Sequence, residues 1–288
     1  MNRIGDLFRK VYIHPLLWLV IGISIATGYF IDVLLVLGIL FIHELGHGVV
    51  AHVFSWRIKR IALLPFGGVA EMDEFGNRSQ KEELLVVLAG PLQHVWLLVL
   101  GWGMYSLGWI SPYYYETFKL YNWMILLFNL LPIWPLDGGK LVNIVLHSFM
   151  PFMEAYKWSV LTSTGLLVLL HGYVLFQFPY HLHLWIVMTF LYFSLWLEWK
   201  QRYYIHMKFL LERYYGKKTS VSRLRPMKVQ SDEPLLHVLQ RFYKGYKHPV
   251  IVMENGREAG ELDENELLHA FFTDKRTMAK TKDLLYLY

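Results

Sequence analysis

Long apolar runs, rather than an amphipathic repeat, dominate the first two thirds of the chain. Runs nearly free of charge lie at 14–30, 33–55, 84–107, 119–147, 158–176 and 181–197. Each is close to the roughly 20 residues that an α-helix needs to cross the hydrocarbon of a bilayer. The fourth run contains Pro132, Pro135, Gly138 and Gly139, which a continuous helix does not accommodate. The pattern therefore predicts an α-helical polytopic membrane protein with about six transmembrane helices, one of them broken.

The pattern changes after residue 218, where charged residues become frequent and no apolar run is long enough to cross a membrane. Helical spacing at 234–243 and 264–272, a β-branched stretch at 249–253 and a turn signal at Asn255-Gly256 predict a small α/β domain. We therefore divide the chain into a transmembrane domain at 1–198, a basic juxtamembrane linker at 199–218 and a cytosolic domain at 219–288.

The distribution of charge predicts the orientation of the chain in the membrane. The net charge is +5, but the basic residues lie beside the apolar runs, which indicates membrane topology and no direct partnership with nucleic acid. The positive-inside rule places the basic flanks of the first, second and sixth runs in the cytosol. This arrangement requires an even number of spans, so both termini are expected in the cytosol.

The candidate chemistry lies in the second run, as the sequence His43-Glu44-Leu45-Gly46-His47. Residues four apart share one face of a helix, so both imidazoles can bind one Zn²⁺ while Glu44 flanks the open coordination position. The chain has no cysteine, which leaves His and carboxylate as the strong zinc donors. The pattern indicates metal-assisted amide hydrolysis inside the membrane. The alternative is a polar pair that holds helices together.

The broken run supplies the best third ligand, Asp137, because a catalytic zinc takes three protein ligands. Its alternative role is the N-cap of the helix that begins at Gly138, and both roles can coexist. Asn129 has donors and acceptors suited to an extended peptide, or it satisfies backbone groups freed at the break. Among the other membrane histidines, only His94 is a candidate for a hydrogen bond to a metal ligand. The others are predicted to be core or interfacial residues: His52, His147, His171, His181 and His183.

Taken together, these motifs resemble the site-2 protease family of intramembrane zinc metalloproteases, in the branch that carries a C-terminal cystathionine-β-synthase (CBS) domain. The resemblance rests on His43-Glu44-Leu45-Gly46-His47, Pro65-Phe66-Gly67-Gly68-Val69, Ala89-Gly90-Pro91 and the stretch from Asn129 to Gly139. It implies that His43, His47 and Asp137 bind zinc and that Glu44 is the catalytic carboxylate. One departure is His94, where the family often has Asn.

The resemblance also implies partners. It suggests a membrane-associated substrate, a sporulation sigma-factor precursor, at the mother-cell membrane surrounding the forespore, with control by membrane-embedded inhibitory proteins. The tail resembles one CBS repeat, which implies an adenine nucleotide such as ATP and association of two or more chains; the nucleotide contacts are not assigned.

Substrate contacts are expected at Asn129, Pro135, Gly67 and Gly68. The stretch 58–72 could present an edge strand that pairs with an extended substrate, or it could be a connector in the membrane interface.

Two other functions fit parts of the pattern. In a CBS-regulated divalent-cation transporter, the same three ligands would form a transport site. In a receptor or scaffold, the zinc would be structural. Glu44 beside the first histidine favours hydrolysis.

Overall fold

The computed structural model describes residues 10–64, 67–72, 78–216 and 223–285. The chain divides into two compact units. The first comprises Met1–Glu74, Lys81–Leu141 and Leu170–Leu191, and the second comprises Phe75–Gln80, Val142–Leu169 and Tyr192–Tyr288. Pro65 and Phe66, which belong to one of the motifs above, lie outside the described residues.

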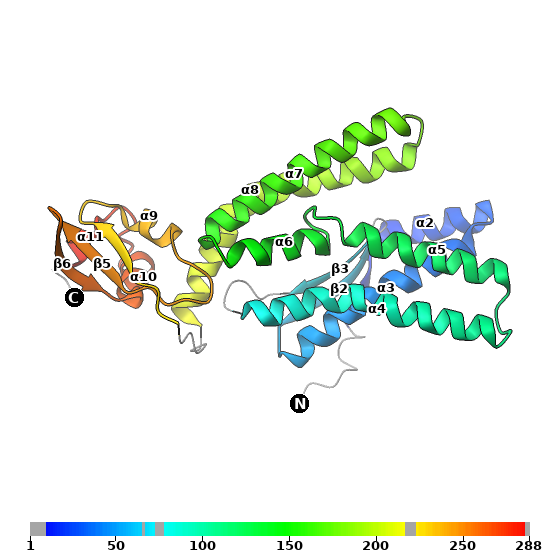
Figure 1. Ribbon diagram of the computed structural model, residues 1–288, viewed down its shortest axis with the longest axis horizontal. Helices are drawn as coiled ribbons and strands as arrows, with labels where there is room; N and C mark the ends of the chain where they lie inside the picture. The colour runs from blue at the N-terminus through cyan, green and yellow to red at the C-terminus, as the bar shows by residue number, and fades with distance from the viewer. Residues whose placement is uncertain (1–9, 65–66, 73–77, 217–222, 286–288) are drawn as a thin grey trace. The chain divides into compact units, whose positions relative to one another are not determined.

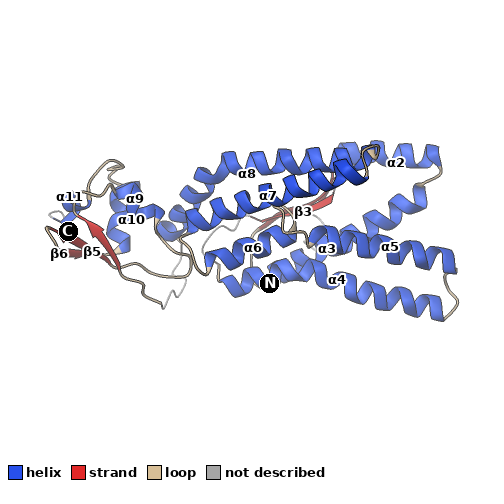
Figure 2. Ribbon diagram, turned by 45° about the horizontal axis from the view of Figure 1, so that its top comes forward, coloured by secondary structure: helices blue, strands red, loops and turns tan. Residues whose placement is uncertain are grey.

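Helices make up most of the described chain (Figures 1 and 2). Those before the tail are α2 (Pro15–Thr27), α3 (Phe30–Val53), α4 (Gln80–Ser106), α5 (Pro112–Asn129), α6 (Asp137–His147), α7 (Phe152–Gln177) and α8 (Leu182–Tyr215). Among the described residues, four helices are long and apolar enough to cross a membrane: α3, α4, α7 and α8. The chain is therefore an integral membrane protein with a mainly helical fold.

The first apolar run gives a shorter helix than the sequence predicts. The helix α2 has 13 residues, a length of roughly 20 Å against the roughly 30 Å of bilayer hydrocarbon. It ends at Gly28, whose left-handed backbone (φ 81°) caps the helix by donating to the carbonyl of Ile25. An apolar run thus includes a helix end that hydropathy alone does not reveal.

The predicted break is present between α5, which ends at Asn129, and α6, which begins at Asp137. The connecting backbone folds closely against the first turn of α6. A Cβ atom on Gly138 would lie 2.2 Å from the carbonyl oxygen of Leu130, and one on Gly139 would lie 2.5 Å from the backbone nitrogen of Trp134. Only glycine fits at these two positions, so the two glycines set where Asp137 is presented.

The stretch 58–72 forms two strands of a three-stranded sheet, β2 (Ile58–Leu64) and β3 (Gly67–Met72). The strand β1 (Val11–Ile13) runs parallel to β2, and β3 runs antiparallel to it. The order β1-β2-β3 leaves β3 at an edge. Ile58 and Ile61 of β2 pack with Ala51 of α3 and Val86 of α4 in one buried cluster, which fixes the sheet against these helices.

The tail is a small α/β domain within the second unit. Its elements are β4 (Met227–Gln230), α9 (Leu235–Gln240), β5 (Val250–Glu254), β6 (Arg257–Leu262), α10 (Glu264–Phe272) and α11 (Thr281–Leu285). The strands β4 and β5 are parallel, and β5 and β6 form a hairpin through Asn255 and Gly256, both with positive φ. Asp263 and Glu266 form a capping box at the start of α10.

The tail is joined to α8 by buried polar contacts. Residues 199–215, expected in the linker, continue α8 as helix. Near its end, Arg213 Nε lies 2.7 Å from Glu264 Oε1, with both side chains under a tenth exposed. Arg213 also donates to the carbonyl of Tyr243 at 2.9 Å, and the backbone N–H of Phe152 in α7 donates to the carbonyl of Phe242. The tail is therefore fixed to the helices of its own unit.

Candidate metal centre

Two imidazoles meet on one face of α3. His43 and His47 are buried, and their Nε2 atoms lie 3.1 Å apart. The spacing of four residues in the helix brings the rings together, edge to face, with centroids 4.8 Å apart. Glu44, the next residue after His43, is also buried.

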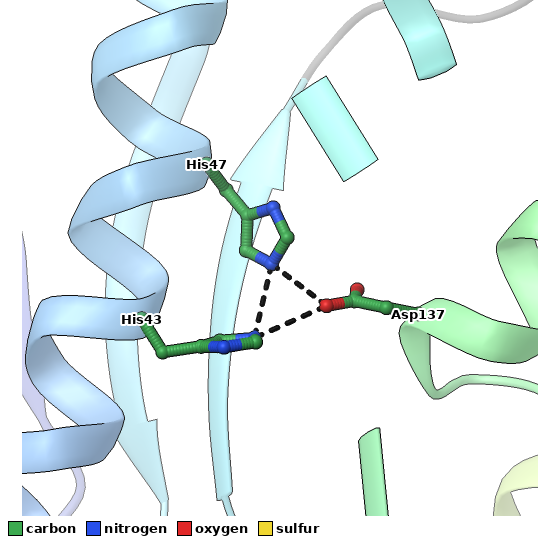
Figure 3. A group of neighbouring side chains, drawn as sticks. All are labelled: His43, His47 and Asp137. Carbon is green, nitrogen blue, oxygen red and sulfur yellow. Dashed lines mark hydrogen bonds and ion pairs between the residues drawn. The ribbon is translucent and has the colours of Figure 1, made fainter. Parts of the chain in front are cut away.

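The third member is Asp137, the first residue of α6, and Figure 3 shows it facing both rings. Its Oδ2 atom lies 3.1 Å from His43 Nε2 and 3.0 Å from His47 Nε2. Its Oδ1 atom accepts from Lys140 Nζ at 2.9 Å, one turn later in the same helix. This contact orients the carboxylate and leaves Oδ2 directed at the imidazoles.

The proton positions favour a cation at this point. His47 Nδ1 lies 2.7 Å from the backbone oxygen of Val86. A carbonyl only accepts, so in a neutral ring Nδ1 carries the proton and Nε2 presents a lone pair. Asp137 Oδ2 is buried and faces the Nε2 atoms of both rings. Electron-pair donors directed at one another without a proton repel, and a bound metal removes that repulsion.

The spacing of the three atoms fits zinc. Donors that are 2.0–2.2 Å from a tetrahedral ion lie roughly 3.3–3.6 Å from one another. The three separations here are 3.1, 3.1 and 3.0 Å, slightly shorter than that range. Within the described residues, these three form the only group of His, Cys, Asp and Glu side chains that could share an ion. The histidines predicted to be core or interfacial residues are not part of this group: His52, His147, His171, His181 and His183.

Two glycines leave room for this arrangement. A Cβ atom on Gly90 of α4 would lie 2.2 Å from His47 Nε2 and 2.8 Å from His43 Cε1. A Cβ atom on Gly68 of β3 would lie 2.2 Å from Glu44 Cγ. The edge strand thus runs directly beside Glu44, and α4 runs directly beside both imidazoles.

The residues expected at the substrate come from β3, from α5 and from the connection between α5 and α6. Gly67 and Gly68 begin β3, and Gly67 has a φ of 148° that favours glycine. Asn129 is the last residue of α5 and donates from Nδ2 to the carbonyl of Ile125 within the same helix, at 3.0 Å. Pro135 is half-buried in the connection to α6.

Some residues that hold the side chains of the site in place were not predicted from the sequence. Asn122 of α5 is fully buried and contacts His94, and Lys140 orients Asp137. The signal for Asn122 was present, because it is a polar residue in the apolar stretch that follows Lys119. Val86 contributes only its backbone carbonyl, which no side-chain pattern can reveal.

Comparison with known proteins places the chain among metallopeptidases. The family model for peptidase family M50 matches residues 31–110 and 103–171. Stage IV sporulation protein FB of Bacillus subtilis is 46% identical over 288 residues, the full length of both chains. Zinc metalloprotease MJ0392 of Methanocaldococcus jannaschii is 34% identical over 177 residues, 57% of this chain and 50% of that protein.

Among solved structures, the site-2 protease from Methanocaldococcus jannaschii matches with a TM-score of 0.52 and 28% identity, over 65% of this chain and 89% of that one. Its helical fold is thus shared by 65% of this chain. The resemblance to the site-2 protease family is confirmed, and the chain belongs to peptidase family M50, the family of the site-2 proteases.

Proposed function

We propose that this intramembrane zinc protease is an endopeptidase that cleaves a membrane-associated protein precursor from the cytosolic side. The observation that carries the proposal is the convergence of His43 Nε2, His47 Nε2 and Asp137 Oδ2 at 3.0–3.1 Å, with Glu44 buried in the same helix turn. A carboxylate next to a metal site inside a membrane is costly to place and is suited to proton transfer.

In this proposal His43, His47 and Asp137 hold Zn²⁺, which supplies Lewis-acid activation of water and of the scissile carbonyl. Glu44 accepts the proton of the attacking water and returns it to the leaving amine. Gly68 keeps the backbone of β3 against Glu44 and limits where that side chain can swing. Lys140 holds the far oxygen of Asp137, so the carboxylate keeps one oxygen free for the ion.

The substrate is proposed to add to β3 as a further strand. A helical substrate must unwind before a peptide bond can be attacked, because its amides are paired within the helix. Within the described part of the chain β3 is an edge strand, and its edge position offers a place for a further strand next to Glu44. Asn129 and Pro135 would bind the extended segment from the broken helix.

The substrate class comes from similarity. The full-length relative is a sporulation protein by its name, which supports a sigma-factor precursor as substrate and the mother-cell membrane surrounding the forespore as location. Basic residues beside the helices support cytosolic termini. Membrane-embedded inhibitory proteins are the proposed regulators.

For the tail we propose one CBS repeat, with ATP or another adenine nucleotide as ligand and association of chains through this domain. The small α/β fold of residues 227–285 is compatible with one repeat. Titrating ATP into the full-length protein tests it: cleavage should change with ATP, and cleavage independent of ATP with no nucleotide bound would exclude a nucleotide role.

The function is tested by incubating purified full-length protein with candidate precursors, with and without a chelator, and identifying fragments by mass spectrometry. We expect one defined cleavage that is lost with chelator and restored by zinc. Glu44→Gln should retain zinc and lose cleavage by at least about 100-fold. Cation flux through the wild-type protein without proteolysis would instead support the transporter.

A further inference from the structure

We propose that His94 and Asn122 are positioning residues that fix the tautomer and orientation of His43, so that its Nε2 lone pair faces the metal. The inference rests on the metal site proposed above and adds a control over one particular ligand. His94 lies in α4 and Asn122 in α5, far apart in sequence from His43 in α3.

The three side chains form a continuous hydrogen-bonded chain. His43 Nδ1 lies 3.1 Å from His94 Nε2, and His94 Nδ1 lies 2.8 Å from Asn122 Oδ1. Asn122 Nδ2 donates to the backbone carbonyl of His94 at 3.0 Å. His94 and Asn122 are fully buried and His43 is 1% exposed, so water does not compete for these contacts.

The direction of every hydrogen bond follows from the last one. The carbonyl of His94 can only accept, which fixes the amide of Asn122 with its nitrogen on that side and its oxygen toward the ring. That oxygen requires a proton on His94 Nδ1. In a neutral ring, Nε2 then accepts, so His43 Nδ1 carries a proton and His43 Nε2 presents its lone pair. This is the form that binds a metal.

The two imidazoles of the site are therefore oriented by different means. His47 is fixed by a backbone carbonyl, that of Val86 in α4. His43 is fixed by side chains, and its orientation depends on residues 94 and 122. Substitution can thus weaken one ligand without touching the other.

The competing role is purely structural, in which His94 and Asn122 hold α4 and α5 together. If the role is purely structural, substituting His94 or Asn122 lowers the stability of the metal-free protein and leaves its zinc affinity unchanged. Positioning predicts a loss of zinc affinity, which separates the two roles.

The experiment measures zinc affinity of full-length metal-free protein by competition with a chelator. We expect His94→Leu to bind zinc about 10- to 100-fold more weakly and Asn122→Leu to show a smaller loss, about threefold to tenfold. His94→Gln places an amide oxygen near the position of Nε2 and should recover affinity to within about fivefold of wild type. The matched control is His171→Leu, a histidine of α7 whose ring packs edge-on against Trp185; it should match wild type.

Two further readouts accompany the affinity. The visible spectrum of the Co²⁺-loaded protein should change in His94→Leu and Asn122→Leu, because one imidazole is reoriented. At saturating zinc, kcat should fall while KM stays within about twofold. Zinc affinities of both leucine variants within twofold of wild type, with unchanged Co²⁺ spectra, would overturn the inference. Wild-type protein that binds no zinc would overturn the metal site itself. If His94→Leu does not fold, Asn122→Leu and His94→Gln still decide the question.

Discussion

At the scale of single residues, the metal centre depends on two positions that carry no side chain. Gly90 leaves the space that both imidazoles occupy, so Gly90→Ala should displace His47 and weaken zinc binding by about tenfold or more. Gly103 lies in the same helix, and a Cβ atom there would meet nothing within 4 Å, so Gly103→Ala is the control. Zinc content after dialysis measures both. Equal zinc content in the two variants would contradict the geometry.

At Gly68 the expected effect falls on Glu44 and not on zinc binding. The three atoms nearest to a Cβ atom there all belong to Glu44. Gly68→Ala should therefore retain zinc and lower kcat, by about 100-fold if Glu44 moves by about 1 Å. Steady-state kinetics together with metal analysis distinguish the two glycines. Loss of zinc from Gly68→Ala would show that the strand supports the metal and not the proton transfer.

The sequence was sufficient for the residues whose chemistry depends on local spacing. The four-residue interval between His43 and His47 determines a shared helix face. Asp137 could be proposed because zinc needs a third donor and the break carries a carboxylate. Asn122 could not be connected with His43, because that link runs through His94 and requires the packing of three helices.

At the scale of elements, the proposed substrate site is formed by the break between α5 and α6 and by the edge strand β3. The break was predictable because Pro and Gly cannot continue a helix. The helical end of α2 at Gly28 was not, because hydropathy reports apolarity and not helix termination. The sheet position of 58–72 followed only in part from the sequence, since β1 pairs with β2 across a long stretch of chain, with Val11 opposite Ile61.

The edge strand can be tested by cross-linking, because the chain has no cysteine and a single introduced one is unique. In a Glu44→Gln background, Ala70→Cys in β3 should cross-link to a cysteine near the cleavage site of a substrate. Ala62→Cys lies in β2, which is paired on both sides, and is the control. Cross-linking that favours Ala62→Cys would exclude strand addition at β3.

At the scale of the whole molecule, the tail is held to α8 by the buried pair of Arg213 and Glu264. Removing one partner leaves the other charge buried, so Glu264→Gln should destabilise the folded tail by about 3–5 kcal/mol. Hydrogen exchange of β5 in the full-length protein measures this. Glu258→Gln, on exposed β6, is the control. Equal exchange in both variants would show that the pair does not hold the tail.

The contacts of Arg213 and Glu264 also predict that the stability of the tail depends on pH. Burial lowers the pKa of His248 from its ordinary 6.5, and the charge of Arg213 adds to this. Burial alone would raise the pKa of Glu264, but hydrogen bonding by His248 and the charge of Arg213 lower it below 4.5. Both pKa values are thus lower in the folded state, and the unfolded state binds more protons at acidic pH.

It follows that tail stability is full above about pH 6.5 and falls as the pH drops, first through His248 and below about pH 4.5 through Glu264. Hydrogen exchange of β5, corrected for intrinsic rates, should show weakening protection between pH 7 and pH 5. Protection that is constant or rises toward acidic pH would contradict the assignment.

The proposed chemistry depends on His43, His47 and Asp137 binding one zinc ion within the membrane. X-ray absorption spectroscopy of the purified full-length protein, combined with its zinc content, examines those bonds themselves. We expect one zinc per chain, with two imidazole nitrogens and one carboxylate oxygen at about 2.0–2.2 Å, and loss of the ion in Asp137→Ala. A protein purified with no zinc, or a zinc environment unchanged in Asp137→Ala, would contradict this assignment.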